Sequence, residues 1–226
     1  MIDNWKISAY LRSPLAGDPP KLDAVLEYEL ALRLGMKHAR KLTRDVRLAD
    51  IERVPIPLAR RTINGVDVYC CSDPITAPTL GEWTDHSAKR FDSDMLVLLL
   101  REDQRKNLLT SSGPYKARFA PIRVRYLECV TWFARGDRKE INKLVKKIVA
   151  LGKHRSIGYG LIDRWEYERM DEDYSIFAPL KGQRVLMKTL HVGEHLEGVK
   201  GYAKYFGAAA PPYWHPENYR EIAVPV

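Results

Sequence analysis

The chain has 226 residues, of which 45% are hydrophobic and 29% charged, a composition typical of a folded globular protein and not of a disordered one. No apolar run approaches the roughly 20 residues that a membrane-spanning helix needs, and the N-terminus lacks the basic start and apolar core of a secretion signal. The cysteines Cys70, Cys71 and Cys129 have no disulfide-framework spacing. We therefore expect a cytoplasmic protein that does not enter a membrane.

The net charge of +8 is concentrated in one part of the chain. Residues 1–100 contain 14 basic and 14 acidic side chains, residues 101–165 contain 16 and 6, and residues 166–226 contain 7 and 9. A strongly basic segment between two nearly neutral ones predicts a localised surface that binds a polyanion such as nucleic acid. The alternative is a solvated basic surface that only keeps the protein soluble.

The first pattern along the chain is a strand followed by a helix. Apolar and polar side chains alternate from Trp5 to Leu11, which predicts a strand, and a turn-rich loop follows. The leucines from Leu22 to Leu34 then fall on one helical stripe. Asp23 lies near the start of this predicted helix, where a carboxylate is favourable.

Residues 42–94 are predicted to be an irregular insertion. Within it, Asn64-Gly65 between two apolar runs is typical of a hairpin turn. Residues 75–94 show neither a helical nor a strand period. Because this stretch is too long for an ordinary connection, we expect it to be a functional or mobile loop.

Regular patterns resume after residue 94. Asp137 precedes Glu140 by three residues, which is the spacing of a capping box at a helix N-terminus. The predicted elements are, in order, a buried strand over 95–100, a basic loop over 103–118, one long strand over 122–136, a helix over 141–151 and a strand over 161–168.

The order of these elements predicts the fold class. Strand, helix, one or two hairpin strands, helix and strand make a ferredoxin-like β-α-β-β-α-β pattern, so we expect an α+β protein. The chain is expected to be a single domain over residues 1–226, with the insertion at 42–94. Residues 171–226 are expected to add strands and an aromatic, proline-rich arm packed on the core.

The most informative segment is ALGKHRSIGYG, residues 150–160, which joins the predicted second helix to the next strand. A dinucleotide-binding fingerprint needs the opposite order, with the strand before the glycines, and no Walker-type Gly-Lys-Ser/Thr is present. Glycines let a polyanion backbone approach closely, the basic side chains supply hydrogen-bond donors, and Tyr159 offers a ring for base stacking. The alternative without a ligand is a helix C-cap followed by a bulge.

The glycine spacing resembles a family signature. G-h-G-x5-G-h-G, with h hydrophobic, is typical of the RAMP proteins of CRISPR systems, and this chain matches it with Ala150 in place of the first glycine. The opening, in which a strand ends at Ser13-Pro14-Leu15 before the segment LDAVLEYEL, is similar to the start of many RAMP subunits. The closing PPYWHP and the length resemble the small Cas-five-type subunit of type IV effector complexes. The resemblance covers residues 5–40 and 120–220.

The resemblance implies a noncatalytic, cofactor-free subunit of a CRISPR effector ribonucleoprotein in antiviral and anti-plasmid defence. Such a subunit grips the 5′ handle of CRISPR RNA, caps the filament of RAMP backbone subunits and contacts the large subunit, with target DNA and a recruited helicase as further partners. The residues expected to bind RNA are Arg12, Lys116, Arg118, Lys146, Lys147, Lys153, His154, Arg155, Ser156, Gly158, Tyr159 and Gly160.

The resemblance also implies a thumb-like insertion, which we place at residues 75–94. The residues expected to contact nucleic acid there are Trp83, His86, Lys89, Arg90 and Phe91. The alternative for this segment is a surface loop anchored by a buried Trp83.

Two other functions stay open. Some relatives are metal-independent endoribonucleases that process CRISPR RNA precursors, which requires a general base, a general acid and a cation at the phosphate. His38, His154, Tyr159 and Lys116 are the candidates for these roles. A protein adaptor that binds no RNA would instead use the first helix and the proline-rich tail.

A metal site is not expected. The chain has no Cys-x-x-Cys pair. His191 and His195 are separated by a glycine at 193, and no third ligand follows at a suitable offset.

Overall fold

The computed structural model describes residues 2–34, 47–48, 51, 54–76, 79–89 and 116–226. This part of the chain is a mixed α+β structure of several small sheets and two α-helices. The strand predicted over 95–100 and the predicted basic loop up to residue 115 lie outside the described residues, as do His38, Arg90 and Phe91.

The central sheet has four antiparallel strands in the order β5-β8-β1-β9. Its strands are β1 (Ile2–Leu11), β5 (Ile75–Thr76), β8 (Cys129–Asp137) and β9 (Ile162–Met170). The strands predicted at 5–11 and 161–168 are thus confirmed. Side chains of a strand alternate between the two faces, and Ile7 and Ala9 of β1 are fully buried on the face that the helices cover.

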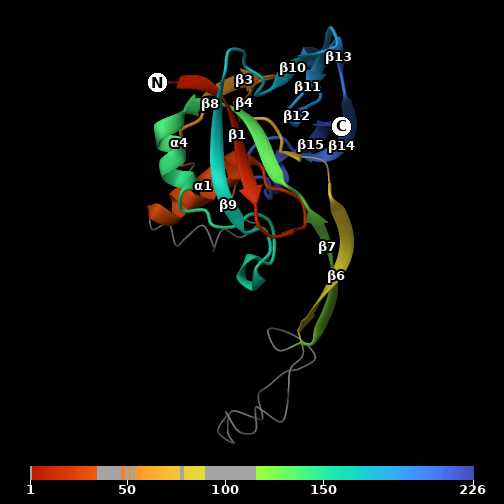
Figure 1. Ribbon diagram of the computed structural model, residues 1–226. Helices are drawn as coiled ribbons and strands as arrows, with labels where there is room; N and C mark the ends of the chain where they lie inside the picture. Colours follow the sequence, from red (N-terminus) through yellow and green to blue (C-terminus); the bar gives the residue numbers. More distant parts are fainter. Residues whose placement is uncertain (1, 35–46, 49–50, 52–53, 77–78, 90–115) are drawn as a thin grey trace, which may run out of the picture.

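Two helices, α1 (Leu22–Arg33) and α4 (Arg138–Val145), lie side by side on this face (Figure 1). The predicted cap of α4 is confirmed, because the Asp137 carboxylate accepts hydrogen bonds from the backbone N–H groups of Lys139 at 2.9 Å and Glu140 at 3.3 Å. Among the helices in the described part of the chain, none is long and apolar enough to cross a membrane.

Helix α4 ends at Val145, six residues before the predicted end at 151. The backbone N–H groups of Lys147 and Ile148 bond to carbonyls three residues back, so the last turn is tighter than an α-helix. Ala150 already forms an isolated bridge with Leu161, which directly precedes β9, and the Ile162 N–H of β9 donates to the Val149 carbonyl at 2.9 Å. Pairing of this segment with a strand therefore stops a helix whose apolar period continues in the sequence.

The long strand predicted over 122–136 is in fact two strands. β7 (Arg118–Tyr126) pairs with β6 (Gly81–Lys89) and β2 (Leu15–Ala16), whereas β8 pairs with β1 and β5 in the central sheet. Burial changes phase between them, because Ile122 and Val124 are buried in β7 and the next buried residue is Leu127. Apolar and polar residues alternate in both β7 and β8 because each strand has one buried face, so the sequence alone did not reveal the break between them.

The prediction of an irregular loop over 75–94 is wrong for most of that segment. Besides β5 it contains β6 (Gly81–Lys89), which pairs antiparallel with β7 from Gly81↔Tyr126 to Lys89↔Arg118. Figure 1 shows β6 and β7, here called the arm, projecting away from the central sheet. Most residues of β6 are exposed, so no buried face imposes the apolar alternation by which a strand is recognised in a sequence.

The remaining strands form a hairpin and the C-terminal extension. The predicted turn at Asn64-Gly65 is confirmed and joins β3 (Arg60–Ile63) to β4 (Val66–Tyr69). The extension contains two three-stranded sheets, β10-β11-β13 and β12-β15-β14. Its elements are β10 (Phe177–Leu180), β11 (Gln183–Leu186), β12 (Leu190–His191), η5 (Glu194–Leu196), β13 (Val199–Lys200), β14 (Tyr202–Ala208), η6 (Pro216–Asn218) and β15 (Tyr219–Pro225).

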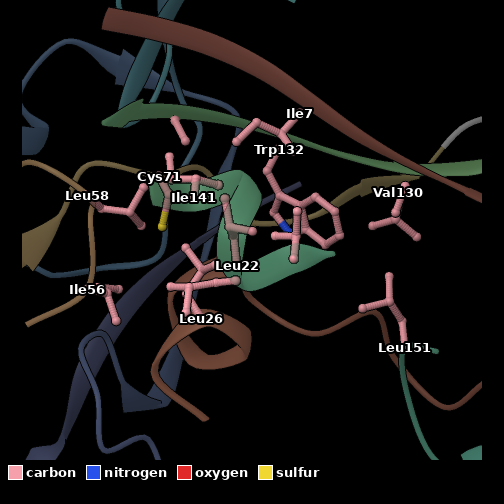
Figure 2. Packing of buried hydrophobic residues seen from close by; sticks show 14 of the residues in the cluster. Ile7, Leu22, Leu26, Ile56, Leu58, Cys71, Val130, Trp132, Ile141 and Leu151 are labelled. Carbon is pink, nitrogen blue, oxygen red and sulfur yellow. The ribbon is translucent and has the colours of Figure 1, made fainter. Parts of the chain in front are cut away.

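The main hydrophobic core lies between the central sheet and its helices. Figure 2 shows Leu22 and Leu26 of α1 and Ile141 of α4 gathered near Trp132 of β8, and all four side chains are fully buried. The Trp132 indole N–H donates to the carbonyl of Pro20 at 3.2 Å, so the ring also fixes the loop that leads into α1.

A buried polar cluster joins this core to the C-terminal extension. Lys188 Nζ lies 3.2 Å from the Asp23 carboxylate at the start of α1, and the Tyr213 hydroxyl donates to the same carboxylate oxygen at 2.7 Å. Burial by itself would raise the pKa of Asp23, but the charge of Lys188 and the Tyr213 hydroxyl hold that pKa below its ordinary value. Lys188 Nζ also lies 3.6 Å from Cys71 Sγ, and burial raises the pKa of this thiol to about 12.

We expect Lys188→Met to destabilise the protein by about 3–5 kcal/mol, because it leaves the Asp23 carboxylate buried without its counter-charge. Urea unfolding measures the loss. The exposed pair Lys6–Glu168, at 2.8 Å, is the matched control, and Lys6→Met should cost no more than about 1 kcal/mol. The double variant Asp23→Asn/Lys188→Met should recover part of the stability, and a double variant no better than Lys188→Met would contradict this account.

Candidate nucleic-acid interface

The glycine loop, residues 150–160, is joined by hydrogen bonds to the segment that ends β1. Lys153 N–H donates to the Ala16 carbonyl at 2.9 Å, and Gly160 N–H donates to the Pro14 carbonyl at 2.7 Å. The Ser13 hydroxyl donates to the Gly158 carbonyl and accepts from Leu161 N–H, both at 2.8 Å. The two sequence motifs that carried the resemblance, Ser13-Pro14-Leu15 and the glycine loop, are therefore one structural unit.

The glycines of this loop have different roles. Gly152 has a φ angle of +75°, and a Cβ there would lie 2.7 Å from the Ala16 carbonyl oxygen. Gly160 has a φ angle of +64°, and a Cβ there would lie 2.0 Å from the Leu151 carbonyl oxygen. Gly158 has a φ of +97°, but a Cβ there would meet nothing within 4 Å. Close packing of the protein's own backbone thus accounts for Gly152 and Gly160, and only Gly158 faces open space.

Tyr159 links the glycine loop to the arm. Its ring packs against Ala16, Ile122 and Val124, and its hydroxyl donates a hydrogen bond to the Asp85 carboxylate of β6. This hydrogen bond lowers the pKa of Asp85 and raises that of Tyr159. The sequence signal pointed to the ring as a stacking surface, whereas in the structure the ring and the hydroxyl have partners within the protein. Asp85 was not singled out, because it lay in a segment predicted to be irregular.

The basic side chains predicted to bind RNA in the glycine loop and just before it fall into two groups. Lys147, Lys153 and Arg155, with Ser156, line a groove beside α1, and the Arg155 guanidinium lies 5.8 Å from the centre of the Tyr28 ring. Lys146 and His154 are exposed and do not line that groove. Within the described residues, no carboxylate forms an ion pair with any of these basic side chains.

Arg12 lies next to the loop at the other end of the Ser13 segment. Its backbone N–H donates to the Leu161 carbonyl at 2.9 Å, and the residue is exposed. The structure thereby brings Arg12 close to the chain that leaves Gly160, although 148 positions separate them in the sequence.

The arm presents aromatic rings and further cations. The rings of His86 and Phe119 stack at 4.7 Å with an interplanar angle of 10°, and Phe119 is 73% exposed. Trp83 is 45% exposed, so it is not a buried anchor of a surface loop. Lys116 and Arg118 are exposed at the start of β7, and the backbone of Lys89 pairs with that of Arg118. Phe119 escaped the sequence interpretation because it directly follows the predicted basic loop.

The acidic side chains of the arm are paired. Glu82 accepts two hydrogen bonds from Arg123, at 2.6 and 3.0 Å, and Asp85 accepts one from Tyr159. Arg125 lies 3.1 Å from Asp18 in the loop before α1. The carboxylates of the arm therefore do little to offset the charge of Lys116 and Arg118.

The face of the central sheet away from the helices has a different character. Lys6 pairs with Glu168 at 2.8 Å, and Arg164 pairs with Glu166 at 2.7 Å while lying 3.9 Å above the Tyr10 ring. Each of these cations has a carboxylate partner, so this face offers little net attraction to a polyanion. At the glycine loop and at the start of β7, by contrast, Lys153, Arg155, Lys116 and Arg118 form no ion pair with a carboxylate among the described residues.

Comparison with known protein families identifies the family of this chain. Residues 5–225 match the family model of the CRISPR type IV associated protein Csf3. The chain belongs to the Csf3 family. Csf3 is a Cas5-like subunit of type IV systems, so the resemblance drawn from the glycine loop and the opening strand is confirmed. No curated protein is similar enough to match this chain.

His191 and His195 of this Csf3-family subunit lie in the C-terminal extension, in β12 and η5. Among the residues that the structure describes, no group of three His, Cys, Asp or Glu side chains is placed to hold a metal ion. His191 and His195 are half-buried, and loss of hydration lowers the pKa of both imidazoles.

We expect Gly160→Ala to destabilise the Csf3-family subunit more than Gly158→Ala does. Both substitutions place a side chain at positive φ, which costs about 1–2 kcal/mol. Only the Gly160 substitution also forces a Cβ against the Leu151 carbonyl, which adds about 1–3 kcal/mol as an overpacking penalty. Urea unfolding of the two variants measures the loss of stability. Equal losses for Gly160→Ala and Gly158→Ala would show that the contact with the Leu151 carbonyl adds no cost.

Proposed function

We propose that this Csf3-family subunit binds the guide RNA of a type IV CRISPR complex without cutting it. In this proposal it grips the 5′ handle, caps the filament of backbone subunits beside the large subunit, and contributes to recognition of target DNA. The observation that carries the proposal is the pairing of two surfaces. The glycine loop and the arm both present unpaired cations, and the Tyr159–Asp85 hydrogen bond fixes one against the other.

The cations supply the attraction to phosphate. The candidates outside the α1 groove are Arg12, Lys116, Arg118, Lys146 and His154, all exposed. Phosphate contacts of this kind position a nucleic acid without reading its sequence. Such contacts suit a subunit that must accept guides of any spacer sequence.

The rings of the arm supply stacking surfaces. Trp83, His86 and Phe119 lie on two paired strands that extend from the body, so an unpaired strand can reach them from solvent. Every base has a flat face, so stacking of this kind tolerates any sequence. In this proposal the arm is the thumb that the sequence predicted.

The central sheet supports a relationship to the ferredoxin-like fold. Its order β5-β8-β1-β9, with α1 after β1 and α4 after β8, is the order expected of a β-α-β-β-α-β core with insertions between its strands. We include this assignment in the proposal. It places the glycine loop just before the last core strand, β9.

Two of the predicted candidates for RNA cleavage fit binding better than catalysis. General acid–base chemistry needs groups within hydrogen-bond reach of the reacting atoms and with a pKa near the working pH. The hydroxyl of Tyr159 donates to Asp85, which raises its pKa further, and His154 is exposed with no described side chain orienting it. In the proposal neither residue is catalytic: His154 contributes to binding, and Tyr159 positions the glycine loop against the arm.

We expect Lys116→Ala/Arg118→Ala to weaken guide-RNA binding and to flatten its salt dependence. Loss of two phosphate contacts should reduce the slope of log K against log salt by about 1–2. Filter binding between low and moderate salt measures the slope. The control Lys181→Ala/Lys200→Ala removes two exposed cations of the extension and should leave the slope unchanged. Equal slopes for all three proteins would refute the assignment of the arm.

We expect Trp83→Ala and Phe119→Ala each to weaken RNA binding by about 1–3 kcal/mol, the usual contribution of one stacked base. Because Phe119 is 73% exposed and Trp83 45% exposed, the free energy of unfolding should change by no more than about 0.5 kcal/mol for Phe119→Ala and about 1 kcal/mol for Trp83→Ala. Phe206→Ala is the control, since Phe206 is 74% exposed in the extension. Loss of folding without a specific loss of binding would mean that the arm rings are structural.

The noncatalytic role has a direct test. Purified protein incubated with precursor guide RNA, first without metal and then with Mg²⁺, should leave the RNA intact. Cleavage at a defined position that disappears in His154→Ala would overturn this part of the proposal and establish an endoribonuclease.

A further inference from the structure

A groove of about 670 Å³ runs between α1 and the chain that follows α4. Clefts of this size commonly hold ligands. Its lining is mostly apolar, and the apolar side chains that form it are Val25, Tyr28, Leu32, Ile148, Val149 and Leu151. The leucines Leu22 and Leu26, on an adjoining face of α1, are buried in the core, and Val25, Ile148 and Leu151 of the groove also belong to that core or pack against it. The groove therefore extends the apolar surface of α1 from the core toward solvent.

Three of the lining side chains are unusually open to water. Tyr28 and Leu32, one helical turn apart on α1, are each 48% exposed, and Val149 across the groove is 71% exposed. Exposed apolar side chains that gather in one concave surface are typical of a site that another molecule covers. A row of two such side chains on α1, with Val149 across the groove, suits an elongated apolar ligand.

Among the charged side chains that line the groove, those without an ion-pair partner in the described part of the chain are all positive. Lys147, Lys153 and Arg155 line the groove, and none of them forms an ion pair with a carboxylate among the described residues. The two acidic residues of the lining are compensated, because Asp18 lies 3.1 Å from Arg125 and Glu29 lies 3.6 Å from Arg33. A ligand that fits the apolar walls will therefore gain from carrying negative charge along one side.

We propose that this groove is a docking site for an amphipathic segment of another protein subunit. The apolar face of that segment enters between α1 and Val149, and its acidic flank meets Lys147, Lys153 and Arg155. This is the arrangement by which helices are commonly held in grooves, with apolar anchors spaced one turn apart. The proposal goes beyond RNA binding, because it gives these three basic residues a protein partner.

The groove fits a protein segment better than RNA. Bases bind unpaired by stacking on aromatic rings, and the apolar walls are aliphatic except for Tyr28, whose ring already has the Arg155 guanidinium above it. The rings suited to bases lie on the arm instead.

Site-specific crosslinking in the assembled complex tests the proposal. The photoreactive residue p-benzoylphenylalanine is placed at Leu32, or at the exposed control position Leu180 of β10, in full-length protein reconstituted with purified type IV subunits and guide RNA. Position 32 should crosslink to a segment of another subunit with apolar residues at helical spacing and acidic neighbours, and position 180 should not reach that segment. Crosslinks only to guide RNA or to a second copy of this chain, or none at all, would overturn the proposal.

A matched pair of variants tests the energetics. Leu32→Ser/Val149→Ser removes two exposed apolar contacts and should weaken binding of the crosslinked subunit by about tenfold or more, as loss of interface anchors does. Its thermal unfolding midpoint and its affinity for guide RNA should match those of the parent and of Leu180→Ser. Unchanged subunit binding would overturn the proposal. A parallel loss of RNA affinity would do so too, because it would identify RNA as the occupant.

Discussion

The buried ion pair between Asp23 and Lys188 holds together parts of the chain that are far apart in the sequence. Asp23 begins α1, Lys188 belongs to the C-terminal extension, and Tyr213 adds a hydrogen bond from near the C-terminus. Two buried charges are tolerated only when each has its partner and its hydrogen bonds. The first helix can therefore take its native position only when the extension is in place. The central sheet and the extension depend on one another through this contact.

The glycine loop depends on a second set of long-range contacts. Ser13 and Ala16 hold its backbone from one side, and Tyr159 holds the arm from the other. A flexible loop would lose conformational entropy on meeting a ligand, whereas this loop is ordered before any ligand arrives. The same contacts hold the glycine loop and the arm in a fixed geometry relative to one another.

The distribution of charge divides the surface into regions with different partners. On the outer face of the central sheet, Lys6 and Arg164 are neutralised by glutamates in cross-strand or neighbouring positions. Lys116 and Arg118 at the arm and the basic side chains of the glycine loop have no such partners among the described residues, whereas Arg123 and Arg125 of the arm pair with Glu82 and Asp18. The basic side chains at the loop divide again between open surface and the apolar groove beside α1. In a subunit of a type IV CRISPR complex, a nucleic-acid surface next to a protein-docking groove would couple RNA loading to assembly.

The sequence by itself determined the features that depend on local pattern. Strands with one buried face, the Asp137 cap and the Asn64-Gly65 turn could all be predicted, because burial and capping impose a period or a fixed residue type. The glycine spacing likewise identified the family. The extent of β6, the end of α4 and the partner of Tyr159 depend instead on tertiary contacts. The arm strand β6 has no buried face, so its sequence shows no apolar alternation. Helix α4 ends at Val145, before the segment in which Ala150 pairs with Leu161. The Tyr159 hydroxyl bonds to Asp85, which lies 74 residues away in the sequence. These outcomes depend on contacts between distant segments, which no local pattern of residues records.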